Sequence, residues 1–255
     1  MVSSPEQRAR LILVIGGARG GKSTFAERLA ARRAAMVAAA GGTATVTYLA
    51  TSEANDPEMV ARVTAHRAAR SATWVTRECP LEVAAAVRGA PPDSIFLLDC
   101  VTFWVSNLLF AAGGLGGTEP QGLGNFDKTF IPREVEETVA VRVTTALDDL
   151  LAALGEAGST MIAVSNEVGF GVVPEYPIAR LYRDELGRAN RRLADAAESV
   201  YLLVAGIPVE LKALAADPFA AESLTAEPLT ADPLATDRPA PRAPSSSPTE
   251  EESPA

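Results

Sequence analysis

The sequence predicts an α/β protein with a mostly parallel sheet and helices on both faces of that sheet. First, short apolar segments alternate with longer stretches of helical character between residues 11 and 212. Second, these segments are nearly continuous in apolar character, which is typical of strands covered on both faces. Third, a glycine-rich turn joins the first apolar segment to the first helical stretch, as at the start of a βαβ unit.

The segments expected to form strands are short and rich in leucine or β-branched residues. They are Leu11–Ile15, Thr45–Ala50, Ser94–Cys100, Thr160–Ser165 and Ser199–Val204. The helices expected between and after them are Thr24–Ala39, Pro57–Ala69, Leu81–Arg88, Arg133–Leu154 and Ile178–Ala197. Pro57 suits an early helical position, because its φ is preset and its missing N–H has no intrahelical partner there. The glycine-rich residues 113–132 interrupt a helical region, and we expect a surface loop.

The two ends of the 255-residue chain differ in composition from the part between them. Residues 1–10 are polar and are interpreted as an extension before a single domain over residues 11–212. From residue 215 onward, eight acidic residues and two arginines contribute −6 to the net charge of −9, and eight of the 18 prolines lie there. Such a segment cannot bury much apolar surface, so residues 213–255 are predicted to form an acidic, Pro/Ala-rich disordered tail.

Composition also excludes some partners. No apolar run approaches the roughly 20 residues that a membrane span needs. No dense basic run or alternation of aromatic and basic residues points to nucleic acid. Cys79 and Cys100 lack metal-ligand spacing and are expected to be buried thiols of a reducing compartment. We therefore expect a cytoplasmic protein.

The turn after the first strand carries the pattern G-x-x-x-x-G-K-[ST]. It consists of Gly16, Gly17, Ala18, Arg19, Gly20, Gly21, Lys22 and Ser23. Glycines let backbone N–H groups point at a phosphate, and the helix N-terminus adds partial positive charge. Lys22 is placed to reach the β- and γ-phosphates, and the Ser23 hydroxyl is a candidate Mg²⁺ ligand. The pattern in this context predicts a nucleotide-phosphate site, the alternative being a glycine-rich turn that binds nothing.

Polar residues follow the other expected strands, where ligands collect in parallel sheets. Thr51 and Ser52 follow the second strand. The third ends in four apolar residues and Asp99, which fits the second acidic motif of phosphate-loop enzymes, whose carboxylate helps to hold Mg²⁺. The alternative is a solvated or helix-capping aspartate. The fourth strand is followed by a shaped loop over residues 166–175, and arginines crowd the next helix, where they either face water or clamp an acceptor phosphate.

The chain has one histidine, His66. Arg62, His66 and Arg70 recur every fourth residue and share a helix face. The arginines should keep the imidazole neutral at about pH 7 and attract an anionic phosphate. A neutral imidazole beside a bound nucleotide can attack phosphorus and form a covalent intermediate. Spacing alone nevertheless favours an ordinary surface histidine.

Several ordered motifs between Leu11 and Lys212 together resemble one family, the bifunctional adenosylcobinamide kinase/adenosylcobinamide-phosphate guanylyltransferases of cobalamin biosynthesis. The motifs are residues 16–23, 48–52, the Arg62…His66-Arg67 helix with Trp74 and Glu78, residues 107–109, 166–175 and the stretch 183–190. The resemblance implies a RecA-like phosphate-loop fold and a homotrimer. It does not extend to the acidic tail.

The resemblance implies two reactions. Such enzymes phosphorylate the aminopropanol hydroxyl of adenosylcobinamide with ATP or GTP. They then transfer GMP from GTP onto that phosphate, which gives adenosylcobinamide-GDP and pyrophosphate. The transfer passes through a guanylylated histidine that matches His66, so the resemblance favours a nucleophile there. The residues it assigns are His66 and Lys22 for catalysis and, for the nucleotide, the phosphate loop with Ala50, Thr51, Ser52, Arg67, Ala68, Ala69, Arg70, Glu78 and Asp99.

The chain departs from the family pattern at four places. Gly20 stands where the family usually has serine, Ala65 replaces the first member of a His-His pair, and Ser71 replaces a proline. Asp99 is one methylene shorter than the usual glutamate, so its role is metal binding, guanine contact or both. The first change keeps the backbone cradle, and the second leaves His66 as the one candidate nucleophile.

Two other functions fit part of the pattern. One is a different small-molecule phosphate-loop kinase in which the histidine is never modified. The other is a GTP-binding switch, which should carry an Asn-Lys-x-Asp motif for guanine, and none of the three lysines stands in such a context.

Overall fold

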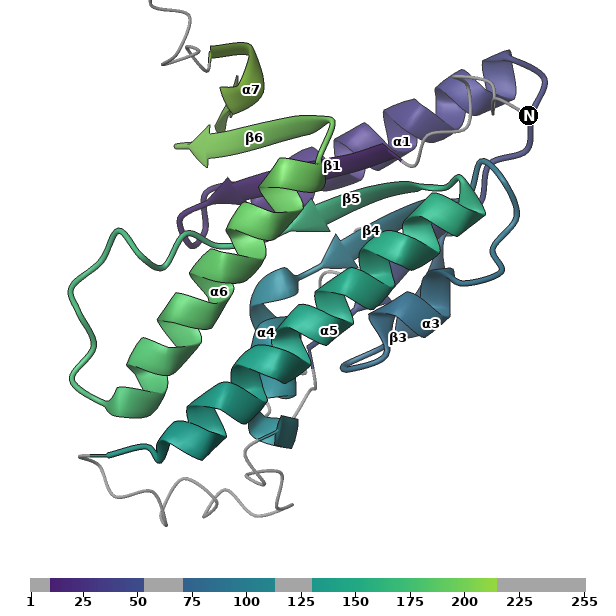
Figure 1. Ribbon diagram of the computed structural model, residues 1–255. Helices are drawn as coiled ribbons and strands as arrows, with labels where there is room; N and C mark the ends of the chain where they lie inside the picture. Colours follow the sequence, from purple (N-terminus) through teal and green to yellow (C-terminus); the bar gives the residue numbers. More distant parts are fainter. Residues whose placement is uncertain (1–9, 53–70, 113–129, 215–255) are drawn as a thin grey trace, which may run out of the picture. The chain divides into compact units, whose positions relative to one another are not determined.

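The computed structural model describes residues 10–52, 71–112 and 130–214, and within them one seven-stranded sheet has the order β3-β2-β4-β5-β1-β6-β7 (Figure 1). The strands are β1 (Arg10–Gly16), β2 (Val46–Ala50), β3 (Val75–Glu78), β4 (Ile95–Asp99), β5 (Thr160–Val164), β6 (Ser199–Val204) and β7 (Ile207–Glu210). The helices are α1 (Lys22–Ala39), α3 (Val83–Val87), α4 (Val101–Ala112), α5 (Arg133–Ala157), α6 (Pro177–Ala196) and α7 (Leu211–Leu214).

Neighbouring strands of the described sheet are parallel, apart from the antiparallel pair β6 and β7. The strand β5 pairs with β1 on one side and with β4 on the other. The carboxyl ends of β1, β5 and β4 therefore meet at one edge of the sheet. This arrangement confirms the predicted α/β fold with a mostly parallel sheet, and it fixes where a ligand can bind.

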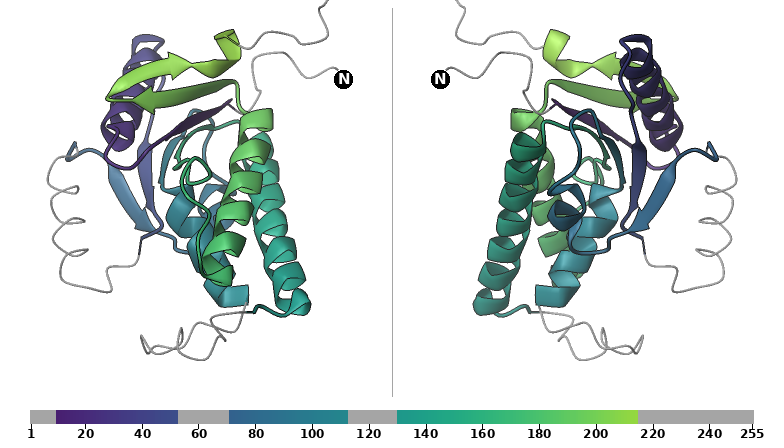
Figure 2. Two further views of the ribbon diagram at one scale, coloured as in Figure 1. Left: turned by 90° about the vertical axis from the view of Figure 1, so that its left-hand side faces the viewer. Right: turned by 90° about the vertical axis from the view of Figure 1, so that its right-hand side faces the viewer.

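Helices cover both faces of the sheet, as predicted. Helix α1 packs on β1, β2, β4 and β5 from one side, whereas α4, α5 and α6 lie together on the other side (Figure 2). The larger core, on the side of α4 to α6, includes the fully buried Trp104, Leu150 and Leu186. The smaller core, under α1, includes Ala26 and Leu97. Burial of each large side chain contributes about 1.5–3 kcal/mol before conformational entropy is counted.

Four elements were not predicted, namely the edge strands β3 and β7, the core helix α4 and the short helix α7. All four residues of β3 are exposed, so this edge strand has no apolar signature. Strand β7 contains Pro208, which is tolerated because the strand lies at the other edge. The turn before it places Ala205 and Gly206 at positive φ, the geometry of a tight hairpin. Helix α4 begins directly after β4, and α7 is a single turn.

Four predicted segments fall wholly or mostly outside the described residues, namely the N-terminal extension over residues 1–10, the helix over Pro57–Ala69, the loop over residues 113–132 and the acidic tail over residues 213–255. The predicted strands and the other predicted helices are present, with ends that differ by a few residues. In the described part of the chain, no helix is long and apolar enough to cross a membrane.

Candidate active site

The phosphate loop lies between β1 and α1. Gly16, Arg19 and Gly21 have positive φ values of 145°, 57° and 84°, so the backbone curls three times within six residues. The N–H of Gly20 donates to the Gly17 carbonyl at 3.3 Å inside this curl. Among the described residues no side chain caps α1, and the first turn of α1 contains no acidic residue. The N–H groups and the positive end of the helix are thus available to an anion.

Gly16 is fixed by its surroundings. A Cβ atom at this position would lie 2.5 Å from the carbonyl oxygen of Leu203 on β6. Real Cβ atoms do not approach backbone oxygen so closely, and the positive φ disfavours any other residue as well. The close passage of β1 past β6 is therefore what requires the first glycine of the motif.

Lys22 is the first residue of α1 and is only 7% exposed. Its Nζ donates a hydrogen bond of 2.7 Å to the Gly17 carbonyl. The ammonium charge is held over the loop, where it can meet the phosphates of a nucleotide. Ser23 follows in the same turn and is partly buried.

A second polar cluster lies at the carboxyl ends of β2, β3 and β4. Thr51 is fully buried, and its Oγ1 donates to the Cys100 carbonyl at 2.7 Å and accepts from the Cys100 N–H at 2.8 Å. The Asn107 amide on α4 donates to the Thr51 carbonyl at 2.8 Å. The N–H of Cys79, next to Glu78, donates to the Ala50 carbonyl at 2.8 Å. The strand register thus brings Ala50, Thr51, Ser52, Glu78 and Asp99 to one region.

Asp99 ends β4 with its carboxylate partly exposed. The Tyr48 hydroxyl on β2 donates to its Oδ2 at 2.7 Å. Burial, and secondly the negative charge of Asp99, raise the pKa of the Cys100 thiol to about 11. Asp99 therefore has a fixed orientation and is a structured carboxylate, not a freely rotating surface group.

The two clusters are separated by β5. Strands in a sheet are about 4.8 Å apart, so Asp99 lies about 10 Å and Glu78 about 19 Å from β1 across the sheet. The phosphate loop and Glu78 therefore cannot contact the same phosphate. A bound nucleotide can span the distance from one cluster toward the other.

The carboxyl end of β5 carries a third group of polar residues, which the sequence marked only as a shaped loop. Buried Asn190 on α6 accepts a hydrogen bond of 2.6 Å from Ser165 Oγ and donates at 3.0 Å to the Asn166 carbonyl and to Glu167 Oε1. Asn166 donates through both its N–H and its side-chain amide to Thr102 Oγ1, each at 3.1 Å. The N–H of Glu167 reaches the Gly16 carbonyl at 3.3 Å. Asn166, Glu167 and Asn190 stand in two of the motifs that carry the family resemblance, but the sequence assigned them no role.

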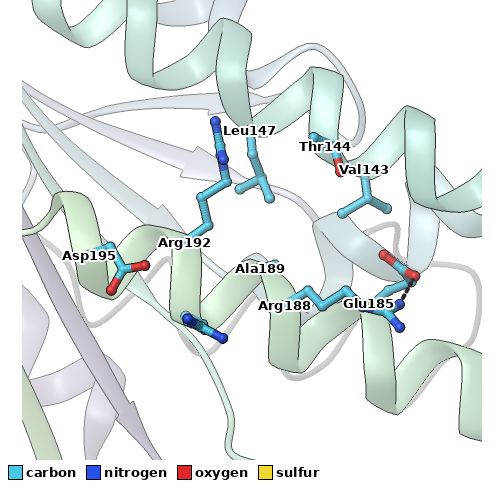
Figure 3. Close-up of a pocket in the computed structure, with 9 residues that line it drawn as sticks. Val143, Thr144, Leu147, Glu185, Arg188, Ala189, Arg192 and Asp195 are labelled. Carbon is cyan, nitrogen blue, oxygen red and sulfur yellow. Dashed lines mark hydrogen bonds and ion pairs between the residues drawn. The ribbon is translucent and has the colours of Figure 1, made fainter.

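Four arginines of α6, namely Arg180, Arg183, Arg188 and Arg192, make hydrogen bonds or ion pairs within the protein. Arg180 donates to the carbonyls of Pro174 and Glu175 at 3.0 and 2.6 Å and so holds the end of the loop after β5. Arg188 pairs with Glu185, and Arg192 pairs with Asp148 on α5. Glu185, Arg188 and Arg192 line a pocket of about 260 Å³ between α5 and α6 (Figure 3). This pocket contains no residue of the phosphate loop, which favours a structural role for these two arginines.

Glu185 lies on α6 and is only 2% exposed. Burial raises the pKa of its carboxyl, and the charge of Arg188 opposes the rise. Tyr182, one turn earlier, donates from its hydroxyl to the Thr102 carbonyl at 3.2 Å, and burial raises its pKa. Tyr182 thus fixes α6 against α4, and with it the position of Asn190, whereas the pair of Glu185 and Arg188 lies within α6.

Five predicted site residues, namely His66, Arg67, Ala68, Ala69 and Arg70, lie outside the described residues. Cys79 and Cys100 are free and buried, as expected. In the described part of the chain no group of three or more His, Cys, Asp and Glu residues could hold a metal ion. The oxygen donors present, the Ser23 hydroxyl and the Asp99 carboxylate, fit Mg²⁺, which usually binds through one or two protein ligands, water and substrate phosphates.

Comparison with known proteins gives a consistent assignment. A family model described as "Cobinamide kinase / cobinamide phosphate guanyltransferase" matches residues 12–211. The chain is 40% identical to the "Bifunctional adenosylcobalamin biosynthesis protein CobU" of Salmonella typhimurium over 79% of this chain and 99% of that protein. It is 39% identical to the "Bifunctional adenosylcobalamin biosynthesis protein CobP" of Pseudomonas aeruginosa, over 78% and 96% of the two chains. It is 38% identical to the Escherichia coli CobU protein, over 79% and 99%. This chain therefore belongs to the cobinamide kinase/cobinamide phosphate guanyltransferase family.

Proposed function

We propose that the protein phosphorylates adenosylcobinamide with ATP or GTP and then transfers GMP from GTP onto the product, through a guanylylated His66. The observation that carries this proposal is that the phosphate loop and the cluster around Thr51 and Asp99 lie at the same edge of the sheet. Lys22 is fixed on the phosphate loop by its hydrogen bond to the Gly17 carbonyl. The phosphate loop suits a transferable phosphate. The cluster around Thr51 and Asp99 offers polar groups to the rest of a nucleotide. Membership of the family supports the pairing of the two reactions.

Both reactions move phosphorus between nucleophiles, so positioning and charge neutralisation supply most of the catalysis. Lys22 and the N–H groups of the loop would hold the triphosphate. Ser23 and Asp99 would hold Mg²⁺, which would neutralise charge on the phosphates. In the second reaction the His66 ring nitrogen would attack the α-phosphorus and release pyrophosphate, and the acceptor phosphate would then attack the phosphorus bound to nitrogen. Arg67 and Arg70 would neutralise the phosphate during this transfer.

The side chains of the loop after β5 indicate an acceptor that is large and partly apolar. Phe170, Val172 and Val173 are 83%, 93% and 63% exposed within one loop. The loop begins at Glu167, which bonds to Gly16, and ends where Arg180 holds the Pro174 carbonyl. A clamped loop that presents apolar side chains beside a phosphate site suits a corrin ring better than a small polar substrate.

A homotrimer in the cytoplasm completes the proposal, and residues 213–255 would be a solvated tail outside the catalytic domain. The matched residues end at 211, before that segment.

The test is to assay the two half-reactions separately with purified protein. Adenosylcobinamide and ATP should give the phosphate, and the phosphate with GTP should give adenosylcobinamide-GDP and pyrophosphate. Lys22→Ala should lose both reactions, whereas His66→Asn should lose only the second. Retention of the second reaction by His66→Asn would support instead a kinase or transferase without a covalent intermediate.

A further inference from the structure

Three carboxylates of the described residues end or follow strands at the carboxyl edge of the sheet. They are Glu78 on β3, Asp99 on β4 and Glu167 after β5. Strand β5 pairs directly with β1, whereas β4 is one strand further and β3 is at the edge. Glu167 is thus the one of the three beside the strand that carries the phosphate loop. Its own N–H bonds to Gly16, the first residue of the motif, at 3.3 Å.

The carboxylate of Glu167 is held from one side. Its Oε1 accepts from the Asn190 amide at 3.0 Å, and Asn190 is only 6% exposed. The same amide nitrogen donates to the Asn166 carbonyl, which can only accept, so the nitrogen and oxygen of Asn190 are not interchangeable. Its Oδ1 accepts from Ser165 Oγ at 2.6 Å. Asn190 therefore has one orientation, and it orients Glu167.

The other oxygen of this carboxylate has a different environment. Glu167 is partly exposed, and Oε2 has no hydrogen-bond partner among the described residues. One oxygen is thus fixed by a buried amide while the other remains able to accept a proton. Asp99, by comparison, is two strands from β1 and has an oxygen bonded to the Tyr48 hydroxyl.

We propose that Glu167 is the general base of the kinase half-reaction and that Asn190 is its positioning residue. This inference rests on the proposed function. The carboxylate takes the proton of the acceptor hydroxyl as the acceptor oxygen bonds to the γ-phosphorus. The bond from that phosphorus to the β–γ bridging oxygen breaks, and its electron pair leaves with ADP. The protonated Glu167 then releases its proton to water.

The second half-reaction needs no such base. A neutral imidazole attacks the α-phosphorus of GTP, and an ionised phosphate later attacks the guanylylated nitrogen. Neither nucleophile is an alcohol, so no hydroxyl proton has to be removed. Loss of the Glu167 carboxylate should therefore lower phosphorylation and spare GMP transfer, whereas loss of Lys22, which holds the triphosphate in both reactions, should lower both.

The decisive variant is Glu167→Gln, assayed in both half-reactions with the full chain. We expect kcat of phosphorylation to fall by about 100-fold or more, the usual effect of losing a general base. Guanylylation and GMP transfer should stay within about threefold of the unaltered protein, because positioning of the nucleotide is retained. Glu198→Gln, which removes the same charge at the amino end of β6, is the matched control and should change neither reaction.

Asn190→Ala tests the positioning role. It should lower phosphorylation by about tenfold, and in Glu167→Gln it should cause no further loss, because residues that act as a unit are not additive. A merely structural Asn190 would add its loss to that of Glu167→Gln. Retained GMP transfer by Asn190→Ala shows that the variant is folded.

Equal losses in both half-reactions of Glu167→Gln would overturn the inference, because Glu167 would then serve nucleotide or metal binding. Unchanged phosphorylation would overturn it too. If the unaltered protein does not phosphorylate cobinamide, the proposed function is wrong. If the unaltered protein does phosphorylate it and Glu167→Gln does so equally well, only the inference about Glu167 is wrong, so the two failures are distinguishable.

Discussion

The N–H of Glu167 donates a hydrogen bond of 3.3 Å to the carbonyl of Gly16, so the loop after β5 starts beside the start of the phosphate loop. The two segments are about 150 residues apart in the chain, and the insertion of β5 between β1 and β4 brings them together. The phosphate loop, the proposed base and the exposed apolar loop are consequently parts of one edge.

Gly16→Ala should destabilise the protein by about 2 kcal/mol or more, since it combines a clash with a strained backbone. The added Cβ would lie 2.5 Å from the Leu203 carbonyl at a φ of 145°. Urea unfolding followed by circular dichroism measures the change in the free energy of unfolding. Gly17→Ala is the matched control, because a Cβ there meets nothing within 4 Å. Equal stability of the two variants would contradict the close approach of β1 to β6.

Thr51→Val should cost about 1–3 kcal/mol of stability, because it leaves the buried N–H of Cys100 without its acceptor. The hydroxyl that accepts this N–H also donates to the Cys100 carbonyl. Thr51→Ser keeps the hydroxyl and should lose much less. If urea unfolding shows Thr51→Val to be at least as stable as Thr51→Ser, the hydroxyl contributes no more than the methyl group, and the hydrogen bonds to Cys100 are not the main contribution of this residue.

The two cysteines should be unreactive in the native protein at about pH 8, because the thiolate is the reactive form. Burial raises the pKa of Cys79, with Arg77 opposing, and raises that of Cys100 to about 11. A thiol whose pKa is higher in the folded state adds stability that is complete below its unfolded pKa of about 9. That stability is lost as the pH rises through about 11 for Cys100.

Ellman's reagent measures this reactivity. Both thiols should react after denaturation in guanidinium chloride, and neither should react quickly before it. Rapid labelling of a native thiol would show that its surroundings open or that its pKa is not raised.

Phe170→Ser and Val172→Ser together should raise KM for cobinamide by about tenfold, as two exposed apolar contacts are lost on binding. Both side chains are more than four-fifths exposed, at 83% and 93%, so folding should be unaffected. Equilibrium binding of GTP is the control and should not change. An unchanged KM would place the acceptor elsewhere.

The phosphate loop could be predicted from the sequence because its chemistry is local. Gly16 to Ser23 are consecutive, and the strand and helix beside them have clear apolar patterns. The apolar strands β1, β4 and β5 were predictable for the same reason. Edge strand β3, whose four residues are all exposed, left no such pattern.

The role of Glu167 could not be predicted in this way. Its contacts to Gly16 and Asn190 depend on strand order and helix packing. No local sequence pattern predicts the order of strands in a sheet. The glycines and polar residues after β5 did indicate a shaped loop at the correct edge. The arginines of α6 gave an ambiguous signal, and their ion pairs with Glu185 and Asp148 became visible only in the fold.

The most direct measurement is to incubate the protein with Mg²⁺ and GTP labelled at the α-phosphate, without corrinoid, and to look for label that survives denaturation. We expect an adduct that is labile in acid, stable in base and absent from His66→Asn, which are the properties of a phosphoramidate. If folded protein binds GTP and no label is retained, His66 is not a nucleophile, and the claim of a covalent guanylyl transfer is wrong.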